Sequence, residues 1–289
     1  MDLERVGKFR IGGELPIWRF GFGAMRLTGP GVWGPPNDLR AAQSVLRRVV
    51  ELGINFIDTA DVYGPGDNER LIRDTLAPYP DRLVIGTKGG VVRSGPATAQ
   101  NPGMGADNSE AHLRRAVEGS LRDLGVERID LYQLHRIDPA VPVEETMGVL
   151  KRLRDEGKIR HIGLSEVGVD EIERARSEVE IATVQNLYNL AQRKRDDVVD
   201  YCGRHGIGFI PFYPLKIGNL EESEDVKSLA VRENVTPALI GLAWLFHRSP
   251  VIIPIPGTSS LKHLEENAEA CRVTLSALDL AMLDKLSAA

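Results

Sequence analysis

The sequence predicts an α/β protein built as a (β/α)8 TIM barrel, and three observations lead to that fold. Short runs of β-branched and other apolar residues alternate with longer amphipathic segments, and a helix after each strand implies parallel strands. The runs are almost continuously apolar, which is typical of strands covered on both faces. The chain has 289 residues, 42% of them hydrophobic, a length that one barrel uses. We therefore expect a single domain over residues 1–289.

Eight strands are expected, and each is bounded by residues that favour turns or helices. They are IWRFGFG (17–23), INFID (54–58), RLVIGTK (82–88), RIDLYQLH (128–135), IRHIGLS (159–165), IATVQN (181–186), GIGFIPF (206–212) and VIIPIP (251–256). Helical patterns lie between them, among them residues 39–52, 109–125 and 144–157. The apolar segment 236–249 is too short to cross a membrane, which takes ~18 residues or more, so we expect it in the outer ring of helices.

Three segments lie outside this repeat. Residues 8–18, KFRIGGELPIW, predict an N-terminal β-hairpin that turns at Gly12 and Gly13 and covers the bottom of the barrel. Extra helices are expected near the C-terminus. Residues 91–107 show neither a helical nor a strand period, and such long loops are usually functional or disordered. His161 begins a strand at the end of the barrel opposite the loops that carry function, so a structural role is expected.

The main alternative fold is a doubly wound parallel sheet that binds a dinucleotide. Its first strand should lead through GxGxxG directly into a helix. Here GFGAMR (21–26) stops at GxG, and no helical pattern follows at once. This fingerprint is therefore absent.

Composition excludes several classes of function. The net charge is −5, with 36 basic and 41 acidic residues interspersed, which gives no basic surface for nucleic acid or anionic membranes. The N-terminus lacks the apolar region of a signal peptide. Cys202 and Cys271 stand alone, so they form neither a disulfide framework nor a metal site, and no metal is expected. These features indicate a cytoplasmic protein with reduced thiols; a monomer is compatible with the sequence, which leaves the oligomeric state open.

Ionisable side chains cluster at the C-terminal ends of three consecutive expected strands. Asp58 ends the second strand, with Tyr63 in the loop beyond; Lys88 ends the third and His135 the fourth. Alone, each has a structural explanation, as a helix cap, a solvated strand end or a histidine on the rim. Together they face the mouth of the barrel, where active sites of this fold lie.

The chemistry of these four residues suits carbonyl reduction. A buried lysine beside a tyrosine favours the phenolate, so the pKa of Tyr63 is expected to fall below about 10. Asp58 would keep Lys88 charged and in place, and His135 could donate a hydrogen bond to the same substrate oxygen. A proton donor without a nucleophile or metal set suits reduction of a carbonyl when a hydride source is bound.

Several motifs together resemble the aldo-keto reductase family. They are DTADVYG, GTKGG, GSLRDLGVERIDLYQLH, GLSEV, QNLYN and IPGTSSLKHLEEN, and they follow the order and spacing of that family from about residue 15 to 285. The resemblance implies an NADPH-dependent carbonyl reductase whose catalytic tetrad is Asp58, Tyr63, Lys88 and His135.

The resemblance also implies where the nicotinamide half of the cofactor lies. Ser165 and Gln185 would bind the carboxamide, and Glu166 replaces the usual asparagine, so it can accept a hydrogen bond but not donate one. Phe212 would stack on the nicotinamide, with Tyr213 in the place of a serine. Lys216 replaces a glycine and either reaches the pyrophosphate or is simply exposed. Further expected contacts are Gly23, Met25, Asp58, Pro214, Leu215 and Gly218.

The phosphate and adenine end is expected after the eighth strand. Ile255, Gly257, Thr258 and Ser259 would line it, and Ser259 or Ser260 would cap the following helix. Some relatives carry basic residues at the positions of Ser259 and His263. Here Lys262 and His263 remain to meet a 2′-phosphate, so NADPH is favoured and NADH is not excluded. Glu266 and Asn267 match the adenine contacts.

Two functions from different classes fit the resemblance. One is an aldehyde or ketone reductase. The other is a cofactor-binding protein without turnover, similar to the potassium-channel β-subunits of the same fold. The complete tetrad favours the enzyme. Within the family, GFGAMRLTGPGVWGPP (21–36) and YGPGDNERLIRDTL (63–76) are most similar to bacterial pyridoxal reductase-like members, which implies pyridoxal or another small aromatic aldehyde as substrate. The substrate pocket would contain Met25, Trp33, Tyr63, His135 and Tyr213, together with the loop 91–107.

Overall fold

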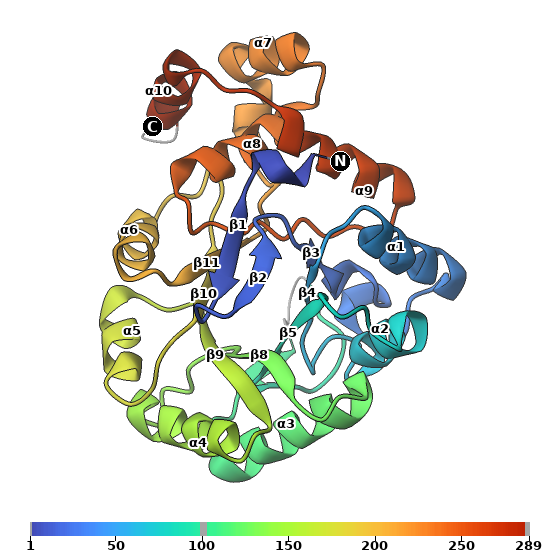
Figure 1. The fold of residues 1–289 in the computed structure, drawn as a ribbon, viewed down its shortest axis with the longest axis vertical. Helices are drawn as coiled ribbons and strands as arrows, with labels where there is room; N and C mark the ends of the chain where they lie inside the picture. Colours follow the sequence, from blue (N-terminus) through green and yellow to red (C-terminus); the bar gives the residue numbers. More distant parts are fainter. Residues whose placement is uncertain (1, 99–102, 287–289) are drawn as a thin grey trace.

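Seven parallel strands curl into a barrel surrounded by helices (Figure 1). The computed structural model describes residues 2–98 and 103–286. In spatial order the strands are β3 (Phe22–Gly23), β4 (Phe56–Asp58), β5 (Val84–Gly89), β8 (Ile129–Leu134), β9 (Ile159–Ser165), β10 (Thr183–Leu187) and β11 (Gly208–Phe212). The expected (β/α)8 barrel is confirmed.

The eighth position of the barrel, called a stave here whether or not it is a regular strand, is filled by a short β-bridge. Ile252 pairs in parallel with Phe209 of β11. On the other side, the Gly21 amide donates to the Pro254 carbonyl at 2.9 Å and closes the ring against the start of the first stave. Pro254 and Pro256 have no N–H group, so they cannot sustain a ladder over 251–256. The strand predicted there is therefore reduced to this bridge.

The first expected strand, 17–23, is divided between two sheets. Its first part belongs to the antiparallel hairpin of β1 (Lys8–Ile11) and β2 (Leu15–Trp18), and only β3 joins the barrel. Between them Arg19 is buried, and its guanidinium donates to the carbonyls of Val6, Phe246, Ser249 and Ile252. These bonds hold the crossover from the hairpin to the barrel, which apolar periodicity alone did not reveal.

The hairpin covers one end of the barrel, as predicted (Figure 1). Ile11 and Ile17 are fully buried against apolar side chains of the barrel interior, among them Phe56 and Leu131. Gly12 turns the chain with φ 56°, and a Cβ there would lie 2.1 Å from the His161 ring. His161 therefore packs under the hairpin turn, which supports its expected structural role.

Ten α-helices among the described residues complete the fold. They are α1 (Leu39–Glu51), α2 (Asp67–Leu76), α3 (Glu110–Leu124), α4 (Val143–Asp155), α5 (Val169–Arg176), α6 (Asp196–His205), α7 (Glu224–Glu233), α8 (Pro237–Arg248), α9 (Leu261–Glu269) and α10 (Ala277–Leu286). Short 3-10 helices are η1 (Leu3–Arg5), η2 (Ala24–Arg26), η3 (Pro30–Val32), η4 (Gly218–Glu222) and η5 (Ala270–Arg272). Helices α7 and α10 are the extra elements and lie beyond α8, outside the ring (Figure 1). No helix in the described ranges is long and apolar enough to cross a membrane.

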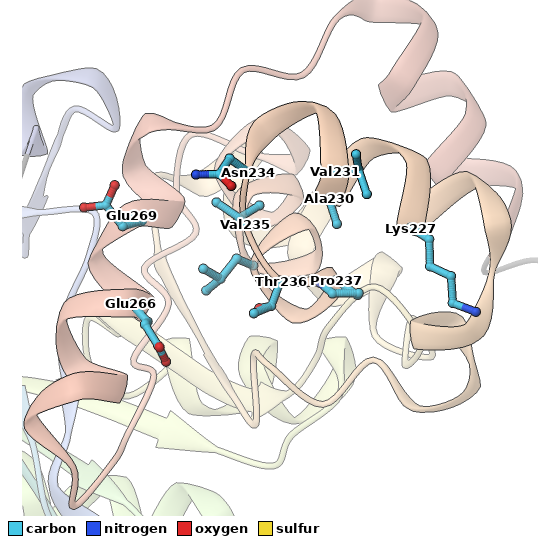
Figure 2. A pocket seen from close by; sticks show the side chains of 10 residues that line it. Lys227, Ala230, Val231, Asn234, Val235, Thr236, Pro237, Glu266 and Glu269 are labelled. Carbon is cyan, nitrogen blue, oxygen red and sulfur yellow. The ribbon is translucent and has the colours of Figure 1, made fainter.

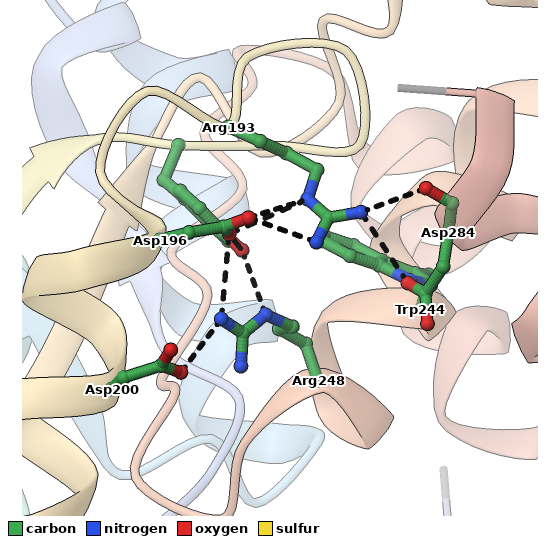
Figure 3. A network of polar contacts seen from close by, with 7 residues as sticks. Arg193, Asp196, Asp200, Trp244, Arg248 and Asp284 are labelled. Atoms are coloured by element: carbon green, nitrogen blue, oxygen red, sulfur yellow. Dashed lines mark hydrogen bonds and ion pairs between the residues drawn. The ribbon is translucent and has the colours of Figure 1, made fainter. Parts of the chain in front are cut away.

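The extra helix α10 is attached by a network of charged side chains (Figure 3). Arg193, in the loop after β10, donates to Asp196 of α6 and to Asp284 of α10. Asp284 also accepts from the Trp244 indole of α8 at 2.9 Å. Arg248 joins the same group through Asp196 and Asp200. The network thus links α6, α8 and α10 to the loop after β10.

The segment 91–107 contains regular structure that the sequence did not predict. Strands β6 (Val91–Arg93) and β7 (Met104–Ala106) pair antiparallel, with Val91 opposite Ala106; residues 99–102 lie outside the described ranges. The strands are three residues each, which is too short for a sequence period to show. The expected irregular loop is therefore a small hairpin at its base.

Candidate active site

Strand alternation explains why the catalytic candidates point into the barrel. Residues two apart on a strand share a face, and Phe56, Val84 and Leu131 belong to the buried cluster of the barrel interior. Two residues after Phe56 comes Asp58; four after Val84 comes Lys88; four after Leu131 comes His135. Asp58 and Lys88 therefore occupy the last inward positions of β4 and β5, and His135 continues the inward face directly after β8, at the C-terminal mouth.

Asp58 and Lys88 form a buried ion pair. The Lys88 ammonium lies 2.6 Å from Asp58 Oδ2 and donates to the Thr59 carbonyl at 2.8 Å. Lys88 is fully buried and Asp58 is 2% exposed. Burial works against the charge of Lys88, but the Asp58 carboxylate and Tyr63 outweigh it, so the pKa of Lys88 is above its ordinary value. Lys88 is therefore charged at neutral pH.

Tyr63 lies beside this pair, but its pKa differs from the prediction. The Lys88 ammonium is 5.1 Å from the centre of the Tyr63 ring. Burial raises the pKa of Tyr63 more than Lys88 lowers it, and the Asp58 charge adds to the rise, so the phenol pKa lies above 10. The expected fall is wrong because removal of the phenolate from water outweighs one paired ammonium. Tyr63 consequently holds its proton at neutral pH, with a cation ready to stabilise the phenolate.

His135 completes the tetrad as a neutral imidazole. Its ring meets the Tyr63 ring edge-on, with centres 6.0 Å apart. Burial, together with the charges of Lys88 and Arg136, holds the pKa of His135 well below 6.5. His135 Nδ1 is buried and has no hydrogen-bond partner among the described residues. An unpaired acceptor is tolerated better than an unpaired N–H, which favours the proton on Nε2, where it can be donated.

The residues expected at the nicotinamide lie on the neighbouring staves. Ser165 and Gln185 are register partners on β9 and β10 and are buried at the mouth. The Ser165 hydroxyl accepts from Arg136 at 3.3 Å. Glu166 has φ 58°. One oxygen of its carboxylate accepts a hydrogen bond from the Leu187 amide at 2.8 Å, so that oxygen already has a partner within the protein.

The loop after β11 presents two aromatic rings. Phe212 and Tyr213 meet edge-on at 5.4 Å, and Tyr213 is 44% exposed with φ 52°. Asn189 holds this turn by donating to the Tyr213 carbonyl at 3.0 Å. Lys216 is exposed and lies 6.0 Å from the Tyr213 ring centre. Pro214 and Leu215 form the turn between them, and Gly218 begins η4.

Backbone atoms pack closely where the last stave meets the first. A Cβ at Gly23 would lie 2.8 Å from the Ile255 carbonyl oxygen, and one at Gly257 would lie 2.4 Å from the Gly23 oxygen. Of the two candidate caps, Ser260 is the N-cap of α9, and its hydroxyl accepts from the His263 amide at 3.4 Å. Thr258 is buried, whereas Ser259 and His263 are exposed.

The side chain of Trp33, in the loop after η3, lies beside that of Arg93 of β6. Trp33 is 37% exposed, and the Arg93 guanidinium lies 5.7 Å from its ring centre. Arg93 donates to the carbonyls of Gly31 and Val32, and the Val32 carbonyl also accepts from the Gly64 amide. The loop with Trp33 is thereby fixed against both β6 and Gly64, the residue after Tyr63. Met25, in η2, is partly buried.

A groove of about 720 Å³ lies away from the tetrad, between α7, α8 and α9 (Figure 2). Its walls include Val231 and Pro237 on one side and Glu266 and Glu269 of α9 on the other. Glu266 therefore lines this groove together with residues of α7 and α8. Asn267, its neighbour, is buried.

Comparison with known proteins identifies the family. The family model described as the aldo/keto reductase family matches residues 19–288. The chain belongs to the aldo/keto reductase family.

Relatives of this aldo/keto reductase agree with that assignment. It is 45% identical to an uncharacterised oxidoreductase of Schizosaccharomyces pombe, covering 99% of this chain and 91% of the relative. It is 41% identical to pyridoxine 4-dehydrogenase of Escherichia coli, covering 95% and 96%. An aldo/keto reductase from Klebsiella pneumoniae, solved with NADP and acetate, superposes with a TM-score of 0.81 at 27% identity, covering 97% and 95%. The chain is therefore an oxidoreductase, as predicted.

Three buried polar residues of this aldo/keto reductase were missed from the sequence. Gln133 is fully buried and donates to Asp58 Oδ1 at 3.1 Å. Behind the tetrad, the Thr87 hydroxyl donates to Glu69 at 2.6 Å, and both side chains are buried. A polar residue at an inward position of an apolar strand, as in DLYQLH, was the available signal for Gln133. Glu69 lies on α2, where a helical carboxylate is ordinarily assigned to solvent.

Glu69 should make the stability of the protein depend on pH. Burial raises its pKa from 4.5 to about 7, so the folded protein retains a proton that the unfolded chain releases. The stability that this proton provides is full below pH 4.5 and is lost as pH rises through about 7, a loss on the order of 3 kcal/mol. We expect Glu69→Gln to be more stable than the wild type at pH 8, as measured by urea unfolding.

The control for this prediction is the same comparison at pH 5. There the wild-type carboxyl group is protonated in the folded protein, so the two proteins should be nearly equal in stability. Burial and the Glu69 charge both raise the pKa of Asp61, so the difference between the two proteins includes the coupling of these two carboxyl groups. If the unfolding free energies of the wild type and of Glu69→Gln change by the same amount between pH 5 and pH 8, Glu69 is already ionised in the folded protein at pH 5 and its pKa is not raised.

Proposed function

We propose that this aldo/keto reductase reduces an aldehyde or ketone to an alcohol with NADPH, taking the proton from Tyr63. The observation that supports this most directly is the geometry of Tyr63 between the Asp58–Lys88 pair and His135. When bound, the nicotinamide supplies the hydride that adds to the carbonyl carbon, and the phenol proton goes to the carbonyl oxygen.

Each member of the tetrad has a separate role in this proposal. The pKa of Tyr63 is raised by burial, so the phenol is protonated and can donate at neutral pH. Lys88 stabilises the phenolate that remains, and Asp58 fixes the ammonium through the contact at 2.6 Å. His135 is neutral because its pKa is lowered, so it orients the carbonyl through an N–H without competing for the proton.

The residues at the mouth of the barrel fit the nicotinamide cofactor NADPH. Ser165 and Gln185 offer a hydroxyl and an amide to a carboxamide, and Phe212 offers a ring for stacking. The backbones of Gly23 and Gly257 are so close that neither position has room for a side chain. Ile255 and Thr258 lie on either side of Gly257 in the sequence. The capped start of α9, with Ser259 beside it, suits a phosphate group.

The 2′-phosphate of NADPH would meet Lys262 and His263. The Lys262 side chain is 82% exposed and lies 3.6 Å from Glu266, a contact weak enough to be exchanged for a phosphate. His263 is exposed beside it. NADPH-bound aldo/keto reductase of Klebsiella pneumoniae, 28% identical with a TM-score of 0.80, supports the same choice. NADH remains the alternative cofactor.

A panel of carbonyl compounds assayed with NADPH and with NADH tests this function. We expect oxidation of NADPH with a reactive aromatic aldehyde such as 4-nitrobenzaldehyde, and a lower KM for NADPH than for NADH. The panel should include pyridoxal. Tight cofactor binding with no turnover of any carbonyl would instead support the regulatory role known from the potassium-channel β-subunits.

We further propose a small aromatic aldehyde, such as pyridoxal, as the substrate. The name of the Escherichia coli relative, pyridoxine 4-dehydrogenase, supports this class. So do the aromatic residues near the tetrad, Trp33 and Tyr213, each partly exposed and able to contact a flat ring. Met25 would complete the wall on the side of the first stave.

Replacement of Trp33 tests the aromatic wall. We expect Trp33→Ala to raise KM for pyridoxal more than KM for butanal, because an aromatic contact contributes roughly 0.5–1.5 kcal/mol beyond area burial and a short aliphatic chain cannot make it. The affinity for NADPH should not change. Equal changes in both KM values would place Trp33 outside the substrate pocket, packed only on Arg93.

The proposal places the enzyme in the cytoplasm. Cys202 and Cys271 are both free and buried, which suits a reducing compartment. Burial raises the pKa of each thiol to about 12, so neither is reactive at neutral pH.

A further inference from the structure

We propose that Gln133 is a positioning residue for reduction, holding the Asp58 carboxylate so that Lys88 stays directed at Tyr63. Gln133 touches neither substrate nor the expected cofactor in this proposal; it acts through Asp58. The inference rests on the proposed function, because it assigns Gln133 a part in the same proton transfer.

The two oxygens of Asp58 have different partners. Oδ2 binds the Lys88 ammonium at 2.6 Å. Oδ1 accepts from two amides, Gln185 Nε2 at 2.9 Å and Gln133 Nε2 at 3.1 Å. A carboxylate held at both oxygens has one orientation, and that orientation sets where the ammonium lies. The Thr59 carbonyl, at 2.8 Å from Lys88 Nζ, is the second fixed point.

Gln133 lies close to both members of the ion pair: it is beside Lys88 of β5 and donates a hydrogen bond to Asp58 of β4. It is the register partner of Lys88 across β5 and β8 and has no exposed surface. Its side chain is on the inward face of β8, as is that of Leu131 two residues earlier; His135, two residues later, follows the end of the strand. An amide at this position thus lies next to Lys88 and contacts Asp58 without being an acid or a base itself.

The neighbouring strand β9 leaves space for this side chain, and side chains of β10 orient it. Gly163 is the partner of Gln133 on β9, and a Cβ there would lie 2.8 Å from Gln133 Cγ and 2.3 Å from the Thr183 hydroxyl. Gln133 Oε1 lies 3.5 Å from Thr183 Oγ1 and from Gln185 Nε2. Because its oxygen faces these donors, its NH₂ group is turned toward Asp58.

Gln133 differs from Gln185 in having no second task. In the proposed function, the Gln185 amide also serves the cofactor carboxamide. Gln133 makes its contacts only within the barrel wall, so it holds Asp58 whether or not a cofactor is bound. Without it, Asp58 Oδ1 keeps only the Gln185 amide, which is shared with the cofactor carboxamide in the proposed function. The carboxylate is then less firmly oriented, the Lys88 ammonium moves with it, and the Tyr63 phenolate is less stabilised.

The test compares three variants by kcat, KM for the carbonyl, Kd for NADPH and Tm. Gln133→Met keeps the size but removes the donor, and we expect kcat to fall about 10- to 100-fold, as for other small misplacements of catalytic groups. KM and Kd should stay within about twofold. Leu131→Met, at the previous inward position of β8, is the matched packing control and should keep its kcat.

Gln133→Glu provides the readout that a packing role would not give. The new carboxyl group lies beside Asp58 in a buried site, so its pKa should be raised by burial and by the like charge. When protonated it can donate to Asp58 Oδ1 and replace the amide. Its kcat should therefore return toward the wild-type value as pH falls. The other ionisable groups that face this position are Asp58, Lys88, Tyr63 and His135, and they are unchanged in the wild type and in Gln133→Met, which should lack this recovery.

Several results would overturn the inference. A kcat of Gln133→Met within twofold of the wild type, or an equal loss in Leu131→Met, would leave only a packing role. Absence of recovery at low pH in Gln133→Glu would exclude the hydrogen bond to Asp58, and this variant decides the question if Gln133→Met is too unstable to assay. Tyr63→Phe is measured in parallel: if it retains turnover, the proposed function fails, whereas its loss with full activity in the Gln133 variants refutes only this inference.

Discussion

Tyr63→Phe should lose carbonyl reduction by about a hundred- to ten-thousand-fold, the usual cost of removing a general acid. Phenylalanine preserves the ring that packs against His135 at 6.0 Å but has no proton to give. The affinity for NADPH should stay nearly unchanged, because Tyr63 is not among the expected cofactor contacts. Steady-state kinetics and a fluorescence titration with NADPH measure the two quantities.

The outcome separates two roles for the same side chain. If Tyr63 only shaped the pocket, the phenylalanine variant would keep most of its kcat and lose little in KM. Near-wild-type turnover would mean that another group supplies the proton, and the assignment of the tetrad would be wrong.

Lys88→Met should have the second-largest effect, with kcat reduced by about a hundredfold or more. Burial already raises the pKa of Tyr63, and loss of the ammonium would raise it further because nothing then stabilises the phenolate. The variant should also be less stable, since a buried ion pair that loses one partner costs roughly 3–5 kcal/mol. Turnover and unfolding free energy are both measured.

A second substitution distinguishes the two consequences. Adding Asp58→Asn to Lys88→Met removes the unpaired carboxylate, so stability should recover while turnover does not. Asp58→Asn alone should reduce kcat less than Lys88→Met, because Lys88 keeps its bond to the Thr59 carbonyl. A greater loss in the Asp58 variant would reverse the proposed order of roles.

Local patterns were sufficient where burial on both faces imposed one period on the sequence. The barrel strands, the helices at 39–52, 109–125 and 144–157, and the covering hairpin were all predicted. The polar ends of strands pointed to Asp58, Lys88 and His135 because strand alternation and the common direction of parallel strands bring such ends together. Sequence patterns failed where a few hydrogen bonds define a strand that is too short or too irregular to show a period. Examples are residues 251–256, which contain two prolines, and the three-residue strands β6 and β7.

The sequence by itself determined the fold, the family and the identity of the four ionisable residues at the mouth of the barrel. Only the tertiary structure decided their electrostatics. Burial, which no sequence window reports, raises the pKa of Tyr63 despite Lys88, lowers that of His135 and raises that of Glu69 to about 7. The tertiary structure also shows that Gln133 donates a hydrogen bond to Asp58, although the two residues are 75 positions apart in the sequence. The physical reason is that pairing across the barrel and the exclusion of water depend on all staves at once, whereas strand and helix periods depend only on neighbours in the chain.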